Sequence, residues 1–172
     1  MSRVLIAGIG NIFLGDDGFG CEVAKRLASR TLPDGVQVVD FGIRGFDLAF
    51  ALMDKPELAI LVDAVPRGEA PGTLFVIEPE LDDVAVSANG HGMDPVTVLR
   101  LVRGFGGEVG KILVVGCEPA SLDEGMQLTA PVEAAVEEAI AMIGGYLEPN
   151  DKTVIKSSDG IVSDRGVHPR LP

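Results

Sequence analysis

The chain has 172 residues and a net charge of −12, from 14 Lys and Arg against 26 Asp and Glu, and 47% of its residues are hydrophobic. These values predict one globular domain with a buried core, and the acidic balance argues against a nucleic-acid or anionic-membrane partner, because phosphates bind Lys and Arg. Two cysteines are too few for a disulfide scaffold, and no stretch resembles a signal peptide or the ~20 apolar residues of a membrane span, so we expect a cytoplasmic protein.

Five short apolar runs have the length and composition of strands. Continuous runs of this kind are typical of strands that a parallel sheet buries on both faces. The fourth run follows the third after a Gly/Pro loop that is too short for a crossover helix, so we expect this strand to be antiparallel to its neighbours. The five predicted strands are residues 4–7, 36–39, 58–62, 73–77 and 112–115.

Between these runs, apolar residues recur with the period of an amphipathic helix. The pattern from Phe19 to Leu27 predicts a helix that Asp16 caps, and in the next helix Phe46 and Phe50 share the apolar face. The predicted helices begin near residues 17, 45, 95 and 131. The alternation of strands and helices predicts an α/β fold, a three-layer α/β/α sandwich around a mostly parallel five-stranded sheet with one antiparallel strand.

The end of the chain differs in composition from the rest. Residues 149–172 are rich in Pro, Gly, Ser and Asp and keep no hydrophobic period. Three aspartates and four basic residues give this segment a net charge of +1, which leaves −13 on residues 1–148. We predict a single α/β domain over 1–148 and a flexible C-terminal tail over 149–172.

Three aspartates are predicted to reach one edge of the sheet. Asp17 follows the first strand, and Asp40 and Asp63 end the second and third. One strand-end aspartate can simply cap a turn, but three at the edge where α/β sheets bind ligands would repel one another and favour a bound cation. His91, the one histidine of residues 1–148, lies in a glycine-containing loop, and such a carboxylate–imidazole set suits nickel, zinc or iron.

Other common site types fit the sequence poorly. Gly8-Ile9-Gly10 begins like a dinucleotide-binding fingerprint, but Phe13 occupies the position of the third glycine, and Asp17 stands where pyrophosphate would bind. The chain contains neither a P-loop GKS or GKT sequence nor a GxSxG nucleophile elbow. We interpret Cys21 and Cys117 as small buried residues.

The glycine-rich opening segment resembles the signature of the hydrogenase maturation endopeptidases. This segment, residues 8–20, reads GIGNIFLGDDGFG, and further pieces follow in the order found in the family, so that the resemblance covers roughly residues 3–145. The later pieces are Asp40 with Gly42 and Gly45, Leu61-Val62-Asp63-Ala64, the His91 loop, and a closing motif from Gly116-Cys117-Glu118-Pro119 to Leu128-Thr129-Ala130-Pro131.

The resemblance implies an activity. These enzymes remove a C-terminal extension from the large-subunit precursor of nickel–iron hydrogenases after nickel insertion, and they recognise the nickel that the precursor holds. For this chain it implies a phosphorylase/hydrolase-like α/β/α fold, and we expect a monomer that docks transiently on the precursor. The nickel would arrive with the substrate, and no tightly bound resident cofactor is expected.

The resemblance also assigns roles to residues. Asp17, Asp63 and His91 correspond to the metal-contacting residues of the family, and Asp40 corresponds to its further strand-end acid. These four residues form the predicted catalytic set, in which Asp40 or Asp17 orients or deprotonates the attacking water and the nickel positions the substrate or polarises the scissile carbonyl. The enzyme would then be an aspartic-type endopeptidase.

Two segments depart from the commoner family pattern, and two other functions stay open. Ile43-Arg44 replaces the small residues of many members, and the Gly-Met-Asp-Pro sequence after His91 is unusual; both are expected to contact the substrate. One alternative function is a peptidase or amidohydrolase with its own metal, which predicts stoichiometric zinc. The other is a non-catalytic metal-centre assembly chaperone, which predicts binding of the precursor without cleavage.

Overall fold

The computed structural model describes residues 3–79 and 93–148, which form one five-stranded sheet flanked by helices. The strand order is β2-β1-β3-β5-β4, and β4 alone is antiparallel to its neighbour. The strands are β1 (Val4–Ile9), β2 (Val36–Gly42), β3 (Leu58–Ala64), β4 (Leu74–Ile77) and β5 (Lys111–Cys117). The predicted sheet and its antiparallel strand are thus confirmed, although four of the strands run up to three residues further than predicted.

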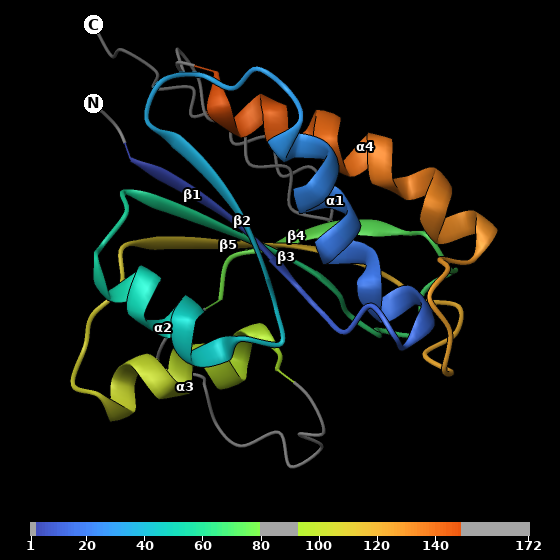
Figure 1. The fold of residues 1–172 in the computed structure, drawn as a ribbon, viewed down its shortest axis with the longest axis horizontal. Coiled ribbons are helices and arrows are strands. Elements are labelled where there is room, and N and C mark those ends of the chain that lie inside the picture. The colour runs from blue at the N-terminus through green and yellow to red at the C-terminus, as the bar shows by residue number, and fades with distance from the viewer. Residues whose placement is uncertain (1–2, 80–92, 149–172) are drawn as a thin grey trace, which may run out of the picture.

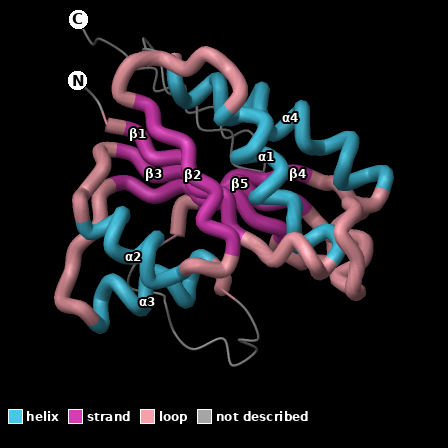
Figure 2. Tube along the Cα trace, in the orientation of Figure 1, coloured by secondary structure: helices cyan, strands magenta, loops and turns pink. Residues whose placement is uncertain are grey.

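The helices cover both faces of the sheet, as Figure 1 shows, with α1 and α4 on one side and α2 and α3 on the other. The same three layers are visible along the Cα trace in Figure 2. The helices are α1 (Phe19–Ala28), α2 (Gly45–Met53), α3 (Pro95–Gly104) and α4 (Ala130–Leu147), and a 3-10 turn, η1 (Gly15–Gly18), precedes α1. The predicted α/β/α sandwich is confirmed.

Two hydrophobic cores lie between these layers. Along β3, Ile60 and Val62 pack toward α1 and α4, whereas Ala59 and Leu61 pack toward α2 and α3. All four side chains are fully buried. Because successive strand residues point to opposite faces, a strand covered on both sides must be apolar at every position, which explains the continuous runs in the sequence.

Two details of the predicted helices are wrong. The α-helix predicted from Asp17 begins at Phe19, and the side chain of Asp16 caps neither α1 nor the 3-10 turn before it. In α2, Phe46 and Phe50 are 58% and 56% exposed, and they pack on the exposed ring of Phe105 instead of on the sheet. The buried residues of α2 include Leu48 and Leu52, and the helix is apolar on most sides, so its period left open which side faces the core.

The start of α3 agrees with the sequence. Asp94 is its N-cap and accepts a hydrogen bond from the N–H of Thr97 (2.7 Å), with Pro95 in the first turn. No helix within residues 3–79 and 93–148 is long and apolar enough to cross a membrane. The predicted tail, residues 149–172, lies outside the described residues, so the proposed domain division stays a prediction.

Candidate functional site

Glycines bring the start of α1 down onto the ends of the strands. A Cβ atom at Gly20 would lie 2.0 Å from the carbonyl oxygen of Val62, closer than any side chain can approach. Gly10, with φ +143°, passes equally close to the backbone of Asp17, where a Cβ atom would lie 1.8 Å from the carbonyl oxygen. The glycine-rich segment therefore positions Asp17 directly against the carboxyl ends of β1 and β3.

Asp17 is a half-buried carboxylate with one hydrogen bond recorded to the backbone. Its Oδ2 accepts from the N–H of Asn11 (2.8 Å), in the loop that follows β1. Burial raises the pKa of Asp17 above its ordinary value, and the bond from Asn11 only partly opposes this shift. A carboxylate whose charge is poorly solvated in this way is stabilised by a proton or by a nearby cation.

Asp63 is the neighbouring carboxylate, on β3, and only 4% of it is exposed. Its pKa is raised well above the ordinary value, first by burial and then by the negative charges of Asp17 and Asp94, against a hydrogen bond from the N–H of Ala64. Asp17 and Asp63 thus form an electrostatically coupled pair. The structure brings these two predicted site residues together.

Asp40 is the third predicted acid. It is exposed on β2, and its Oδ1 accepts from the N–H of Gly42 (3.0 Å). Its neighbours in the strand, Val39 and Phe41, pack toward α2 and α3, so the alternation of the strand turns Asp40 toward α1. On β3 the same alternation, with Leu61 on the α2 side, turns Asp63 the opposite way.

Cys21 is subject to the charges of all three acids. This buried thiol, at the start of α1, donates to the carbonyl oxygen of Gly10 (Sγ to O 3.4 Å). Burial raises the pKa of Cys21, and a hydrogen bond with Asp40 and the charges of Asp40, Asp63 and Asp17 raise it further. The sequence interpretation of Cys21 as a small buried residue is correct, but it missed the proximity of this thiol to Asp40.

The predicted metal ligands are only partly described. His91 lies outside the described residues, so its distance from the acids stays unknown. Within the described residues, no group of three His, Cys, Asp or Glu side chains could hold a metal ion. Asp17 and Asp63 therefore offer two coupled carboxylates, and the ligand set of Asp17, Asp63 and His91 stays a prediction.

Two cavities meet at Asp40 and Cys21. One, of about 320 Å³, lies between the loop after β1 and residues 41–44, and the other, of about 260 Å³, extends toward η1 and Met126. Large apolar side chains are exposed around them: Ile12 is 44%, Phe13 59%, Ile43 64% and Met126 69% exposed. Such a concentration of exposed apolar groups around a cavity is typical of a binding surface.

Asp16, although adjacent to Asp17, faces away from the acidic edge. Its Oδ1 accepts from the N–H of Thr129 (2.7 Å), and its Oδ2 accepts from the N–H groups of Ala120 and Ser121 (2.8 and 3.1 Å) and from the Thr129 hydroxyl (2.8 Å). Burial alone would raise the pKa of Asp16, but these hydrogen bonds together lower it. Asp16 therefore joins the opening segment to the closing motif.

The remaining polar residues of the closing motif also have structural contacts. Buried Glu118 accepts from the N–H groups of Arg67 and Gly68 (2.7 and 3.3 Å) and so orders the loop that follows β3. Cys117 is fully buried, and burial together with the charges of Asp16 and Glu118 raises its pKa to about 12. It is a protonated thiol at neutral pH, as expected of a buried residue rather than a nucleophile.

Comparisons with known proteins agree with one another. A family model described as hydrogenase maturation protease matches residues 21–145. The hydrogenase 2 maturation protease of Escherichia coli is 32% identical over 145 residues, which cover 82% of this chain and 88% of the relative. The structure of the E. coli hydrogenase maturating endopeptidase HybD superposes with a TM-score of 0.73 at 31% identity, over 84% of this chain and 91% of that one. A hydrogenase 2 maturation peptidase from a Thaumarchaeota archaeon gives a TM-score of 0.67 at 34% identity, over 84% and 97% of the two chains.

Proposed function

The chain belongs to the hydrogenase maturation protease family, and from this premise we propose that it cleaves the C-terminal extension from a nickel–iron hydrogenase large-subunit precursor after nickel insertion. The observation that carries the proposal is the coupled pair of Asp17 and Asp63 at the carboxyl edge of a peptidase fold. The nickel ion held by the substrate would supply the positive charge that offsets the repulsion between these two carboxylates.

The electrostatics of the pair support nickel recognition. Both carboxylates have raised pKa values because burial has removed water from them, and Asp17 adds its charge to that of Asp63. An approaching divalent cation favours the ionised form of both and cancels their repulsion. In this proposal Asp17 and Asp63, with His91, contact the nickel, which fixes the precursor in register for cleavage.

Hydrolysis itself requires a water molecule directed at the scissile carbonyl. Asp40 is exposed at the junction of the two cavities, where a peptide and water have access, and Asp17, which follows β1 at the same edge of the sheet, is the second candidate. Either could accept a proton from the water as its oxygen adds to the carbonyl carbon. The carbon–nitrogen bond then breaks, and the proton passes to the leaving amine. The nickel can also polarise the carbonyl as a Lewis acid.

We also propose a cellular compartment and a partner for the enzyme. Cys21 and Cys117 are both free and buried, which supports a reducing compartment such as the cytoplasm. A hydrogenase subunit is the partner that the family assignment supports, and we propose that the enzyme docks on it transiently as a monomer. The exposed apolar side chains around the cavities, Phe13 and Ile43 among them, would form the contact.

The test is the intact mass of a nickel-loaded large-subunit precursor before and after incubation with the protein. We expect the precursor to lose the mass of its C-terminal peptide. A precursor that binds the protein but keeps its full mass would contradict the proposal and favour the chaperone. Stoichiometric zinc in the purified protein, with cleavage of nickel-free precursor, would favour a peptidase with its own metal.

The residue assignments need variants in the same assay. Asp17→Asn and His91→Ala should each slow cleavage strongly, whereas Asp34→Asn, at an exposed turn aspartate before β2, is the matched control and should cleave normally. If both Asp17→Asn and His91→Ala cleaved the nickel-loaded precursor at the full rate, the proposed roles would be wrong.

A further inference from the structure

The two edges of the sheet differ in how well they are protected against an added strand. Natural edge strands are commonly short or carry Lys or Pro, which discourages pairing with another chain. β4 has only four residues. β2 has seven, with the sequence VQVVDFG, contains no Lys or Pro, and within the described residues pairs with β1 alone. The edge of β2 is therefore open to a partner strand.

The main-chain groups of alternate β2 residues face away from the sheet. The N–H of Val4 donates to the carbonyl oxygen of Gly35 (3.0 Å), and in a parallel ladder every second residue from there faces β1. The N–H and C=O of Val38 consequently face outward. At the two ends, the N–H of Val36 donates to the carbonyl oxygen of Pro33 (3.2 Å), and the guanidinium of Arg44 donates to the carbonyl oxygen of Asp40 (2.7 Å). The open stretch therefore runs from the C=O of Val36 to the N–H of Asp40.

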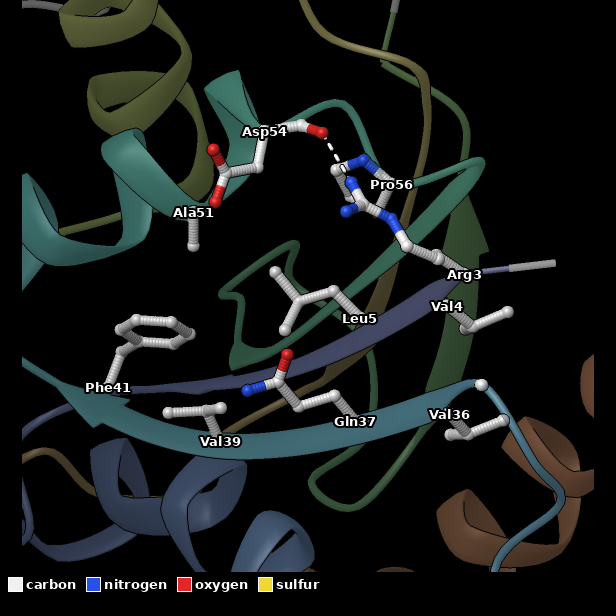
Figure 3. Close-up of a pocket in the computed structure, with 11 residues that line it drawn as sticks. Arg3, Val4, Leu5, Val36, Gln37, Val39, Phe41, Ala51, Asp54 and Pro56 are labelled. Atoms are coloured by element: carbon white, nitrogen blue, oxygen red, sulfur yellow. Dashed lines mark hydrogen bonds between the residues drawn. The ribbon is translucent and has the colours of Figure 1, made fainter. Parts of the chain in front are cut away.

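A cavity of about 420 Å³ lies beside this edge, on the side of the sheet that carries α2. Figure 3 shows the side chains of β1 and β2 on one side of it and the end of α2 on the other. Its lining includes apolar side chains of Leu5, Val39, Phe41 and Ala51, and Gln37 of the same strand face also lines it. A free strand edge beside an apolar cavity is the arrangement with which domains bind extended peptides, since the edge pairs with the peptide backbone and the cavity takes an alternate side chain.

This cavity lies next to the candidate site, with Phe41 between the two. Phe41 lines both the 420 Å³ cavity and the 320 Å³ cavity that contains Asp40 and Cys21. From Val36 to Asp40 the strand advances about 13 Å, at about 3.3 Å per residue, which is the span of a short peptide. A peptide on the edge of β2 therefore leads toward Asp40.

We propose that the C-terminal segment of the precursor binds as an added strand along the free edge of β2. An apolar side chain of this segment enters the cavity of about 420 Å³, and the scissile bond lies beyond Asp40. The inference rests on the proposed function, because the peptide that it positions is the precursor's own. The edge supplies backbone hydrogen bonds that read no sequence, and the cavity supplies the preference for an apolar side chain.

Val38→Pro tests the edge, because it removes an N–H that faces outward and that β1 does not use. Val76→Pro on β4 is the matched control. The hydrogen bond from Glu118 N to Thr73 O (2.9 Å) fixes the alternation on β4, so the N–H of Val76 also faces outward from an edge strand. Like Val38, Val76 is partly buried against the core under α1 and α4.

We expect Val38→Pro to raise KM for the nickel-loaded precursor roughly tenfold, as the loss of main-chain hydrogen bonds at an interface should, with kcat little changed. Val76→Pro should keep the KM of the wild type. An unchanged KM in a folded Val38→Pro variant, while the wild type cleaves, would overturn the added strand alone. If the wild type cleaves no precursor, the proposed function fails, and this inference fails with it.

A second variant keeps the test decisive if proline prevents folding. Ala51→Phe fills the cavity from α2 and leaves the β1–β2 ladder intact, and we expect it to raise KM by a similar factor. Its control is Val109→Phe, which fills a separate cavity of about 310 Å³ beside α3 and should leave KM unchanged. Equal KM values for Ala51→Phe and Val109→Phe, with both variants folded by thermal unfolding, would contradict the proposal.

Discussion

Asp16 and Asp17 are adjacent in the chain and have opposite environments. Asp16 is fully buried and satisfied by three backbone N–H groups and a hydroxyl, which lower its pKa. Asp17 is half-buried, accepts within the described residues a hydrogen bond from the N–H of Asn11 only, and has a raised pKa. The difference shows that burial of a carboxylate is not itself a sign of function; the sign is burial without enough hydrogen bonds to stabilise the charge.

The largest expected effect is on catalysis. Asp17→Asn should slow cleavage of the nickel-loaded precursor by about 100-fold or more, the typical contribution of a carboxylate that handles a proton or holds a metal. The fold should not suffer, because the amide oxygen can still accept from Asn11 and a poorly solvated charge is removed. Single-turnover cleavage and thermal unfolding measure the two effects. If Asp17→Asn instead unfolded the protein enough to explain the loss of rate, Asp17 would be a structural carboxylate like Asp16.

Asp16→Asn should show the reverse pattern. The amide nitrogen cannot accept the hydrogen bonds from Ala120 and Ser121, so two part-buried N–H groups lose their partner, at a cost of up to about 1–3 kcal/mol each. We expect the free energy of unfolding at neutral pH to fall by about 3 kcal/mol. Chemical denaturation measures this, and the variant should still cleave precursor at temperatures where it is folded.

The pH dependence of stability should separate the two kinds of acid. The folded-state pKa of Asp16 lies below 3.8, so its stabilising effect is present above that pH and is lost as the pH falls through the folded-state value. The folded-state pKa of Asp63 is raised, so ionised Asp63 destabilises the fold at neutral pH, and this penalty disappears as the pH falls toward 3.8.

Asp63→Asn should therefore stabilise the protein at neutral pH, by about 1 kcal/mol, which is typical of a stabilising substitution at a functional residue. The gain in free energy of unfolding over the wild type should shrink as the pH is lowered. The loss caused by Asp16→Asn should shrink over the same change of pH, so the two variants approach the wild type from opposite sides. Denaturation curves at several pH values provide the check. A destabilised Asp63→Asn at neutral pH would mean that Asp63 is a structural acid like Asp16.

The smallest effect is expected at an exposed polar link on the same side of the sheet. Arg26 on α1 pairs with Glu22 (2.8 Å) and, across to α4, with Glu133 and Glu137 (3.3 Å), but its side chain is 29% exposed. Arg26→Gln should cost less than about 1 kcal/mol, and high salt should reduce the difference further. If Arg26→Gln lowered the free energy of unfolding as much as Asp16→Asn, the greater exposure of Arg26 would not explain the difference expected between the two residues.

Much of the fold was predictable because it depends on patterns that local sequence carries. Continuous apolar runs gave the strands, the short Gly/Pro loop gave antiparallel β4, and Asp94-Pro95 gave the start of α3. The orientation of α2 was not predictable, since Leu48 and Phe50 are equally apolar and only packing decides which is buried.

The candidate site was predictable in part. Strand ends and the family resemblance identified Asp17, Asp40 and Asp63, and the structure couples Asp17 with Asp63. The separation of Asp40 onto the other face of the sheet depends on strand alternation and on where each strand ends. The role of Asp16 depends on residues more than a hundred positions away, so no local pattern could reveal it.

Recognition of the substrate's nickel by Asp17 and Asp63 is tested most directly by one measurement. The cleavage rate of a large-subunit precursor, followed by intact mass, should be compared for nickel-loaded and nickel-free forms under single-turnover conditions with the wild-type protein. We predict cleavage of the nickel-loaded form and little or none of the nickel-free form. Equal rates for the two forms would contradict the claim, because Asp17 and Asp63 would then act without the cation that their raised pKa values favour.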